Sequence, residues 1–237
     1  MVLRENSYSV EDQRRMSLAR NYFAWQARLA LPLLGRHVLE IGCGIGNFTG
    51  ALLDRELVIA VDGDAACTQI LRDRFQNRSN LHVVNREIGR GSLCDLRALQ
   101  PDSCLCLNVL EHIRDDLGAL EAMSCVLPSG APIVLLAPAF PALFGPIDRN
   151  LGHFRRYTRR SIIALAEAAR LKVRTLRYVN AVGFFGWWVN ARVFRLEKQS
   201  EVQIRIFDQY LLPLFSHLEQ IVKPPFGQSL FAVLEKP

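Results

Sequence analysis

A glycine-rich loop at residues 38–49, VLEIGCGIGNFT, constrains the fold of this chain more than any other stretch. The apolar run at 37–42 is typical of a buried strand, and it leads into Gly42, Gly44 and Gly46. Glycines at such a point let the backbone turn tightly and approach a ligand closely. The spacing is G-x-G-x-G, which differs from the G-x-G-x-x-G loop of dinucleotide-binding proteins and disfavours a dehydrogenase. We expect a ligand at the carboxyl edge of this strand.

Further short apolar runs alternate with helical patterns along the chain. Residues 9–31 predict one or two helices. Further strands are expected at 57–64, 81–84, 103–110, 131–138, 172–179 and 229–236, and further helices at 47–55, 66–75, 115–127 and 159–170. Apolar strands that alternate with helices indicate a doubly wound, Rossmann-like α/β sheet covered on both faces.

The length of the chain and two irregular segments suggest one domain core with lid segments inserted into it. The 237 residues suit a single large domain. The segments at about 139–160 and 180–228 do not follow the alternation, and we expect them to be lid insertions. The predicted organisation is therefore N-terminal lid helices at 1–31 and a core at 32–237 that carries both insertions.

Composition gives only limited information on the partners of the protein and on its cellular compartment. The net charge of +6 favours an anionic partner, although a basic surface without such a role explains it equally well. The six cysteines form no C-x-x-C pair, so we expect a reducing, cytoplasmic setting with no disulfide framework and no metal site. The first fifteen residues contain no apolar core, so no signal peptide is expected.

Two acidic residues accompany the glycine loop. Glu40 stands two residues before Gly42, and Asp62 ends the second predicted strand, 20 residues beyond Gly42. A carboxylate at that strand end can bind both hydroxyls of a ribose. The loop and its acidic partners therefore predict a site for a nucleoside ligand.

The motif E-x-G-x-G-x-G, the acidic end of the second strand and LNVLEHI at 107–113 together resemble the class I S-adenosylmethionine-dependent methyltransferases. The resemblance covers nearly the whole chain and implies a seven-stranded sheet whose last strand is antiparallel. It also implies S-adenosylmethionine as cofactor. The run GHFRRYT at 152–158 is similar to a G-H-x-R-R-Y-T pattern in a bacterial group of these enzymes. That likeness implies the class of chemistry and leaves the acceptor open.

The resemblance assigns one set of residues to the methionine part of the cofactor. Glu40 would orient the methionine amino group, and Asn108 would face the same part of the cofactor. Gly42, Cys43 and Gly44 would let the backbone pass along it.

A second set would hold the nucleoside. Asp62 would bind the ribose hydroxyls, and Gly63 would lie beside the adenine. Members of the family usually carry an aspartate after the third strand that contacts the adenine amine. Here Glu87 is nearest to that place, so either Glu87 substitutes for it or the backbone holds the adenine.

The residues of the GHFRRYT run and of LEHI suggest how an acceptor is activated. His153 can act as a general base near neutral pH, and Asp148 can orient it or bind substrate. His112 either shapes the methyl-transfer site or has a structural role. The alternative for all three is that they hold the segment after the fifth strand against residues 110–113.

The arginines and the tyrosine of the same run have two interpretations. Arg155 or Arg156 can clamp a carboxylate or phosphate, while the other pairs with Asp148 or Glu111. Tyr157 can donate a hydrogen bond to the acceptor. The alternative is that they fasten the lid through salt bridges and hydrogen bonds.

Aromatic residues indicate the character of the acceptor. Trp187 lies in GFFGWWVNARVFRL at 183–196, which either fills a core or forms an apolar acceptor pocket or a membrane-facing surface. Tyr22 in the N-terminal helices can lie near the sulfonium, since an aromatic face favours a cation.

The most consistent interpretation is an enzyme that transfers a methyl group to an O, N or C nucleophile of a small, acidic or lipid-like molecule. Peripheral contact with a membrane fits this interpretation, and it requires no nucleic acid and no obligate partner. The alternatives are an RNA or protein methyltransferase, or a cofactor-binding protein that uses the sulfonium for another reaction.

Overall fold

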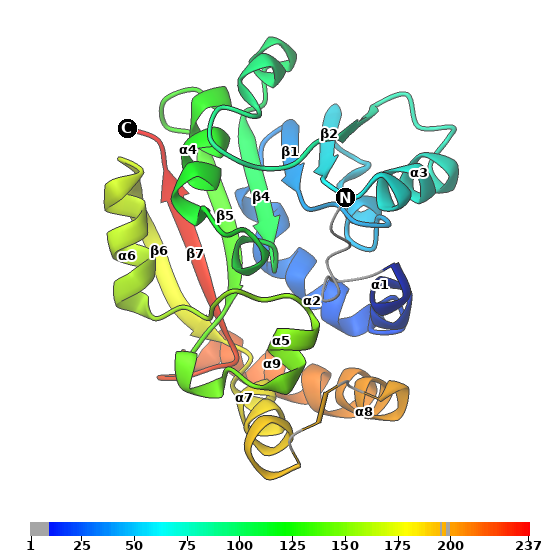
Figure 1. The fold of residues 1–237 in the computed structure, drawn as a ribbon, viewed down its shortest axis with the longest axis vertical. Helices are drawn as coiled ribbons and strands as arrows, with labels where there is room; N and C mark the ends of the chain where they lie inside the picture. The colour runs from blue at the N-terminus through cyan, green and yellow to red at the C-terminus, as the bar shows by residue number, and fades with distance from the viewer. Residues whose placement is uncertain (1–9, 195, 198–199) are drawn as a thin grey trace.

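A computed structural model describes residues 10–194, 196–197 and 200–237 (Figure 1). Residues 1–9 of the predicted N-terminal lid, and 195 and 198–199 of the second insertion, lie outside the described residues. Strands occur at β1 (His37–Ile41), β2 (Leu57–Asp62), β3 (Leu81–Asn85), β4 (Ser103–Leu107), β5 (Pro132–Pro138), β6 (Lys172–Val179) and β7 (Ser229–Glu235).

The seven strands form one sheet in the order β3-β2-β1-β4-β5-β7-β6. The first five strands run parallel, and β7 pairs antiparallel with both β5 and β6. The predicted Rossmann-like sheet with an antiparallel last strand is confirmed. The order reverses between β1 and β4, where doubly wound sheets bind their ligands.

Helices cover both faces of the sheet. They are α1 (Val10–Met16), α2 (Arg20–Ala30), α3 (Ala65–Arg74), α4 (Asp116–Val126), α5 (Pro146–Asn150), α6 (Arg159–Ala168), α7 (Ala181–Trp188), α8 (Glu201–Ile206) and α9 (Leu212–Ile221). Alternate residues of β1 point to opposite faces. Leu39 therefore belongs to the same core cluster as Met123 of α4, whereas Val38 shares a second cluster with Trp25 of α2.

Two elements differ from the sequence prediction. The helix expected at 47–55 is only a 3₁₀ turn at Thr49–Leu52. Gly50 is a poor helix former, and the Thr49 hydroxyl donates to Glu40 of β1, which ties the segment to the sheet. The strand expected at 103–110 ends at Leu107, because Asn108 takes a left-handed backbone conformation with φ of 53°.

The cover helices α1, α2, α5, α7, α8 and α9 gather at the end of the molecule toward which the arrow of β4 points (Figure 1). Two carboxylates, one buried and one half-buried, join them. Asp208, in a π-helical turn at Phe207–Leu211, accepts hydrogen bonds from the backbone N–H groups of Asn21 and Tyr22 at the start of α2. Glu219 of α9 likewise accepts from the first N–H groups of α7. The cover is thus held together by helix-capping charges over the carboxyl edge of the sheet.

Candidate active site

The glycine loop leaves β1 in a conformation that only glycine adopts without strain. The φ angles of Gly42, Gly44 and Gly46 are 72°, 53° and 84°. A Cβ atom at Gly42 would stand 2.2 Å from the Val109 side chain, so the loop passes close to the turn after β4. Gly42, Cys43 and Gly44 also line a cavity, which agrees with the ligand site expected from the glycine spacing.

Asp62 closes the other side of the loop at the end of β2. Its carboxylate accepts hydrogen bonds from the backbone N–H of Gly44 at 2.8 Å and of Asp64 at 2.9 Å. Burial raises the pKa of Asp62, and these two donors oppose that rise. Gly63 follows directly and lies against Glu87. Asp62, Gly63 and Glu87 all line one cavity, so the predicted nucleoside residues do come together.

Glu40 lies under the loop on β1 and is buried. The Thr49 hydroxyl donates to its Oε2 at 2.7 Å. Burial raises the pKa of Glu40 to about 8, although the Thr49 hydrogen bond acts to lower it. Among the described residues, no cation forms an ion pair with Glu40. A cationic ligand group in the cavity would compensate this charge.

Gln13 of α1 caps the glycine loop, a contact that the sequence analysis did not identify. Its side-chain oxygen accepts from the backbone N–H of Ile45 at 2.9 Å, and its amide donates toward the Cys67 sulfur at 3.2 Å. The Asn47 side chain donates to the backbone carbonyl of Gln13 at 2.8 Å. α1 is thereby fastened onto the loop that a cofactor would approach.

Asn108 and Tyr22 meet at the switch point of the sheet. The Asn108 amide donates toward the Tyr22 hydroxyl over 3.4 Å, and both residues line the cavity. Burial raises the pKa of Tyr22 to about 12, so its hydroxyl stays protonated at neutral pH. The N-terminal helices thus contact the end of β4, and Tyr22 and Asn108 lie together in the cavity wall.

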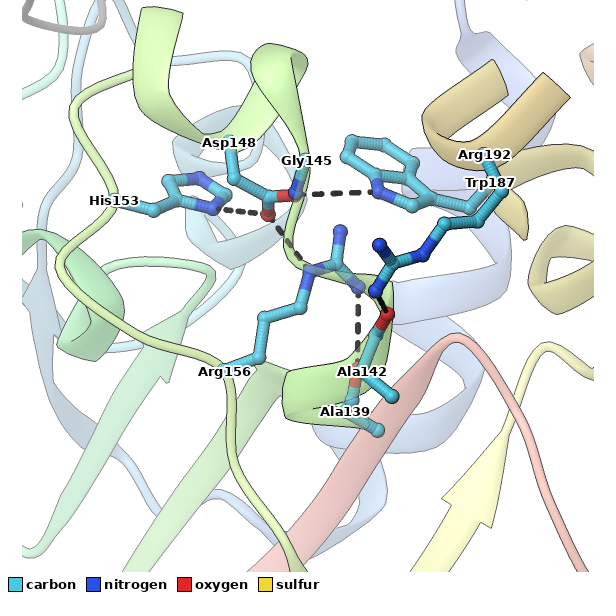
Figure 2. A network of polar contacts seen from close by, with 8 residues as sticks. All are labelled: Ala139, Ala142, Gly145, Asp148, His153, Arg156, Trp187 and Arg192. Carbon is cyan, nitrogen blue, oxygen red and sulfur yellow. Dashed lines mark hydrogen bonds and ion pairs between the residues drawn. The ribbon is translucent and has the colours of Figure 1, made fainter. Parts of the chain in front are cut away.

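Asp148 organises the GHFRRYT run from a fully buried position (Figure 2). Its Oδ1 accepts from Arg156 Nε at 2.8 Å and lies 2.9 Å from His153 Nδ1. Its Oδ2 accepts from the Gly145 N–H at 2.9 Å and from Trp187 Nε1 at 3.4 Å. Burial acts to raise the pKa of Asp148, but the contacts with His153 and Arg156 outweigh it and hold the pKa below its usual range.

This network decides which residues face the cavity. Asp148 is ionised and only accepts hydrogen bonds, so His153 Nδ1 carries a proton and Nε2 carries the lone pair in the neutral ring. The Arg156 guanidinium stacks over the Trp187 ring with its carbon 4.6 Å from the ring centroid, and it also donates to the Ala139 carbonyl. His153, Arg156 and Trp187 line the cavity, whereas Asp148 lies behind them.

Tyr157 and Arg155 lie away from the cavity. The Tyr157 hydroxyl lies within hydrogen-bonding distance of the Leu110 carbonyl, at 3.2 Å, and of the Asp116 carboxylate, at 3.0 Å. Arg155 forms an ion pair with Asp116 and donates to the Arg114 carbonyl. Neither residue is part of the cavity wall, so for both the structure favours the alternative in which they fasten the lid.

Glu111 and His112, from the turn after β4, meet His153. The rings of His112 and His153 pack edge to face with centroids 4.6 Å apart. Burial raises the pKa of Glu111 to about 7, and burial together with the charge of His153 lowers the pKa of His112 to about 3. Glu111 was considered in the sequence only as a partner for an arginine. Glu111 lines the cavity and follows the left-handed turn at Asn108, which ends β4.

The residues of the glycine loop, the predicted nucleoside residues and the Glu111, His112 and His153 cluster line one cavity of about 1130 Å³. Pockets for drug-sized ligands are usually about 300–1,000 Å³, so this cavity has room for a cofactor and a second molecule. One end is lined by the glycine loop, Asp62 and Glu87, and other parts by Glu111, His112 and His153 and by apolar residues of α7 and α8. The arrangement suits a reaction between a nucleoside-bearing cofactor and an apolar acceptor.

Comparisons with known proteins agree with this fold. Residues 39–133 match a family model described as a methyltransferase domain. The ubiquinone biosynthesis O-methyltransferase of Acinetobacter baumannii (strain ACICU) is 26% identical over 127 residues, which are 53% of this chain and 50% of that protein. The chain spans about half the length of the curated relatives it matches.

Solved structures resemble almost the whole chain. A methyltransferase in complex with the Trm112 activator of Haloferax volcanii has a TM-score of 0.64 at 15% identity, covering 96% of both chains. N-methyltransferase NodS from Bradyrhizobium japonicum WM9, in complex with S-adenosylhomocysteine, has a TM-score of 0.55 at 17% identity and covers 99% of this chain and 90% of that one. At these identities the likeness shows the fold.

The fold is that of the class I methyltransferases. Residues 39–133 are thus similar to a methyltransferase domain, and the solved structures that share the fold include S-adenosylmethionine-dependent methyltransferases. Among the described residues, no helix is both long and apolar enough to cross a membrane.

Proposed function

We propose that this protein transfers the methyl group of S-adenosylmethionine to a heteroatom of a small, apolar or lipid-like molecule. The observation that carries the proposal is the single cavity in which the glycine loop and Asp62 share walls with His153 and Trp187. Methyl transfer needs donor and nucleophile in line and water excluded, and a shared, partly apolar cavity supports a reaction of this kind. The cover helices and the segments 139–160 and 180–228 are proposed as its lids.

The residues at the loop fit the cofactor. Gly42, Cys43 and Gly44 line the cavity, and Asp62 offers a carboxylate for ribose hydroxyls. Glu40 is a buried carboxylate without a cation, which suits the methionine ammonium. Asn108 and the phenol of Tyr22 lie at the end of β4, where the methionine part would pass. When bound, the cofactor supplies an electrophilic methyl group on a sulfonium.

His153 is the proposed contact for the proton-bearing atom of the acceptor. Asp148 holds its ring by Nδ1, so that Nε2 offers a lone pair. The sequence predicts a general base here, and the held tautomer supports contact between Nε2 and an acceptor hydroxyl. His112 and Glu111 would form the adjoining wall. Arg156 is engaged by Asp148 and Ala139, so its proposed part is to position Asp148 and Trp187.

The outer surface of the cover supports an apolar or lipid-like acceptor. Most exposed large apolar side chains among the described residues lie in 181–222, namely Phe185, Trp188, Val193, Phe194, Val202, Ile206, Tyr210, Leu211, Leu214, Phe215, Leu218, Ile221 and Val222. Phe185, Phe194, Ile206 and Leu211 also line the cavity. An apolar surface of this size that continues into a cavity fits peripheral contact with a membrane.

Membrane contact is testable with vesicles of anionic phospholipid. Wild-type protein should sediment with the vesicles, and Phe194→Ser or Ile206→Ser should weaken sedimentation. Ile163→Ser removes an exposed apolar residue from α6, outside this surface, and should leave sedimentation unchanged. Equal sedimentation of all variants, or a stable dimer that hides the surface, would argue against membrane contact.

The other acceptors have less support. An RNA or protein acceptor calls for an open basic groove, whereas the described cavity is lined largely by apolar residues at its lid. The name of the Acinetobacter relative specifies an O-methyltransferase of ubiquinone biosynthesis. An oxygen acceptor on an apolar molecule is therefore the preferred form of the proposal.

Calorimetric titration with S-adenosylmethionine and S-adenosylhomocysteine tests the cofactor site. Wild-type protein should bind both, and Asp62→Ala should weaken binding by about 10-fold or more, because it removes the proposed ribose contacts, at least one of them a hydrogen bond to a charged group. Asp54→Ala removes an exposed carboxylate elsewhere and is the matched control. If folded wild-type protein bound neither molecule, the proposal would fail.

A further inference from the structure

Three side chains with metal-binding chemistry converge in the acceptor part of the cavity. One potential ligand atom each from Glu111, His112 and His153 lies within 4.8 Å of the other two. All three residues line the cavity. Glu111 is 1% exposed, and its Oε2 has no hydrogen-bond partner among the described residues. A buried carboxylate oxygen without a partner is costly, and it points to a missing positively charged ligand.

Each histidine has one nitrogen engaged by an acceptor outside the cluster. His153 Nδ1 is held by Asp148 at 2.9 Å, and the backbone carbonyl of Leu151 accepts a hydrogen bond from the His112 ring. Histidines that bind metals almost always donate their other N–H to a carboxylate or a carbonyl in this way. Such contacts hold the ring orientation and present the second nitrogen as a lone pair.

We propose that Glu111, His112 and His153 bind one divalent transition-metal ion, with zinc as the best match, and that this ion binds the acceptor's oxygen. This inference rests on the proposed methyl-transfer function. Two imidazoles and one carboxylate form the ligand set of catalytic zinc sites that keep an open position. The imidazoles favour zinc or another transition metal over magnesium, which prefers oxygen ligands.

The geometry requires only a small adjustment. Zinc ligands stand about 2.0–2.1 Å from the ion, and hence about 3.3 Å from one another in a tetrahedral site. The present separations of up to 4.8 Å would close by an inward movement of roughly 1 Å per side chain. The three residues lie on two connected segments, because the Glu111 carbonyl accepts from the Phe154 N–H at 2.8 Å. The cluster is therefore held together without the ion.

The ion changes how His153 serves the acceptor. A hydroxyl that binds the open position forms an oxygen–metal bond, and its pKa falls. Its O–H bond then breaks with both electrons left on oxygen, and the proton passes to bulk solvent. His153 thus holds the metal instead of taking the proton itself. The nucleophile that results is a metal-bound oxygen anion beside the proposed cofactor site.

The test measures metal and cofactor separately on the full chain. Protein stripped with a chelator is titrated with Zn²⁺ alone, Co²⁺ alone and Mg²⁺ alone, and then with S-adenosylhomocysteine. We expect one Zn²⁺ or Co²⁺ per chain, a visible absorption band from bound Co²⁺, and much weaker binding of Mg²⁺. Glu111→Gln and His153→Ala should each weaken Zn²⁺ binding at least 10-fold. His82→Ala changes an exposed residue of β3 that does not line the cavity, and it is the control for nonspecific binding of Zn²⁺ to a surface histidine.

Binding of S-adenosylhomocysteine shows which idea fails. If the protein binds it and yet binds no Zn²⁺ or Co²⁺ at micromolar concentration, the metal site is wrong and the proposed function stands. If Zn²⁺ binds equally to wild type and Glu111→Gln, the ion lies elsewhere and the proposal is overturned. Glu111→Gln keeps the shape of the side chain, and retained binding of S-adenosylhomocysteine confirms that each variant is folded.

Discussion

Cofactor binding should release a proton from Glu40. Burial raises its pKa to about 8 in the free protein, so about 0.9 of these carboxyls are protonated at pH 7. An opposite charge within hydrogen-bonding range lowers a carboxyl pKa by about 1–3. The methionine ammonium would therefore bring the pKa of Glu40 to about 5–7, and binding at pH 7 should release about 0.4–0.9 protons.

Calorimetry in two buffers measures this release. S-adenosylhomocysteine is titrated at pH 7 in phosphate and in Tris, whose ionisation enthalpies differ, and the difference in observed enthalpy gives the protons exchanged. Glu40→Gln removes the titrating group. The proton release measured with this variant comes from the ligand's own amino group and is subtracted from the wild-type value. At pH 9 the difference between wild type and variant should fall to about 0.1 proton or less, because Glu40 is already ionised. Equal proton release at pH 7 by two proteins that both bind would refute the reasoning.

Three smaller predictions concern stability and the thiols. The pKa of Glu40 is raised on folding, so its contribution to the free energy of unfolding is greatest below pH 4.5 and declines as the pH rises toward 8. Urea titrations at several pH values measure this decline, and Glu40→Gln should make it less steep. Tyr157→Phe should lower the free energy of unfolding by about 1 kcal/mol and leave kcat nearly unchanged, since its hydroxyl lies outside the cavity; a large fall in kcat at unchanged stability would contradict this. The sulfurs of Cys94 and Cys125 lie 2.7 Å apart, so hydrogen peroxide should oxidise the two thiols to one disulfide, detected by mass spectrometry and absent in Cys94→Ser.

Local sequence patterns predicted the part of the site that lies on consecutive segments of the sheet. The glycine loop and Asp62 each follow directly from a buried strand, and parallel neighbours place their carboxyl ends together. Knowing the strands was therefore enough to bring these residues to one edge. The same reasoning placed Asn108 and His153 near that edge. Asn108 directly follows β4, and His153 lies in the segment after β5.

Contacts between segments far apart in the chain could not be predicted from local sequence patterns. Gln13 reaches the glycine loop only because α1 docks there, and Asp208 caps α2 from 187 residues away. Neither residue stands out in a local pattern. The charged run at 145–160 offered several roles to each side chain, and burial decided among them. Asp148 became the centre of a network behind the cavity wall, which the composition of the run does not reveal.

Two buried carboxylates connect the cofactor and acceptor parts of the cavity. Glu40 and Glu111 both line it, burial raises both pKa values, and neither forms an ion pair with any described residue. Burial makes the ionised form of each carboxyl costly, and no ion pair within the described residues offsets that cost. Their cost is explained if positive charge arrives with the ligands. The ammonium of the cofactor would compensate Glu40, and a metal ion would compensate Glu111. The cavity would then be most stable when both the cofactor and the metal ion are bound.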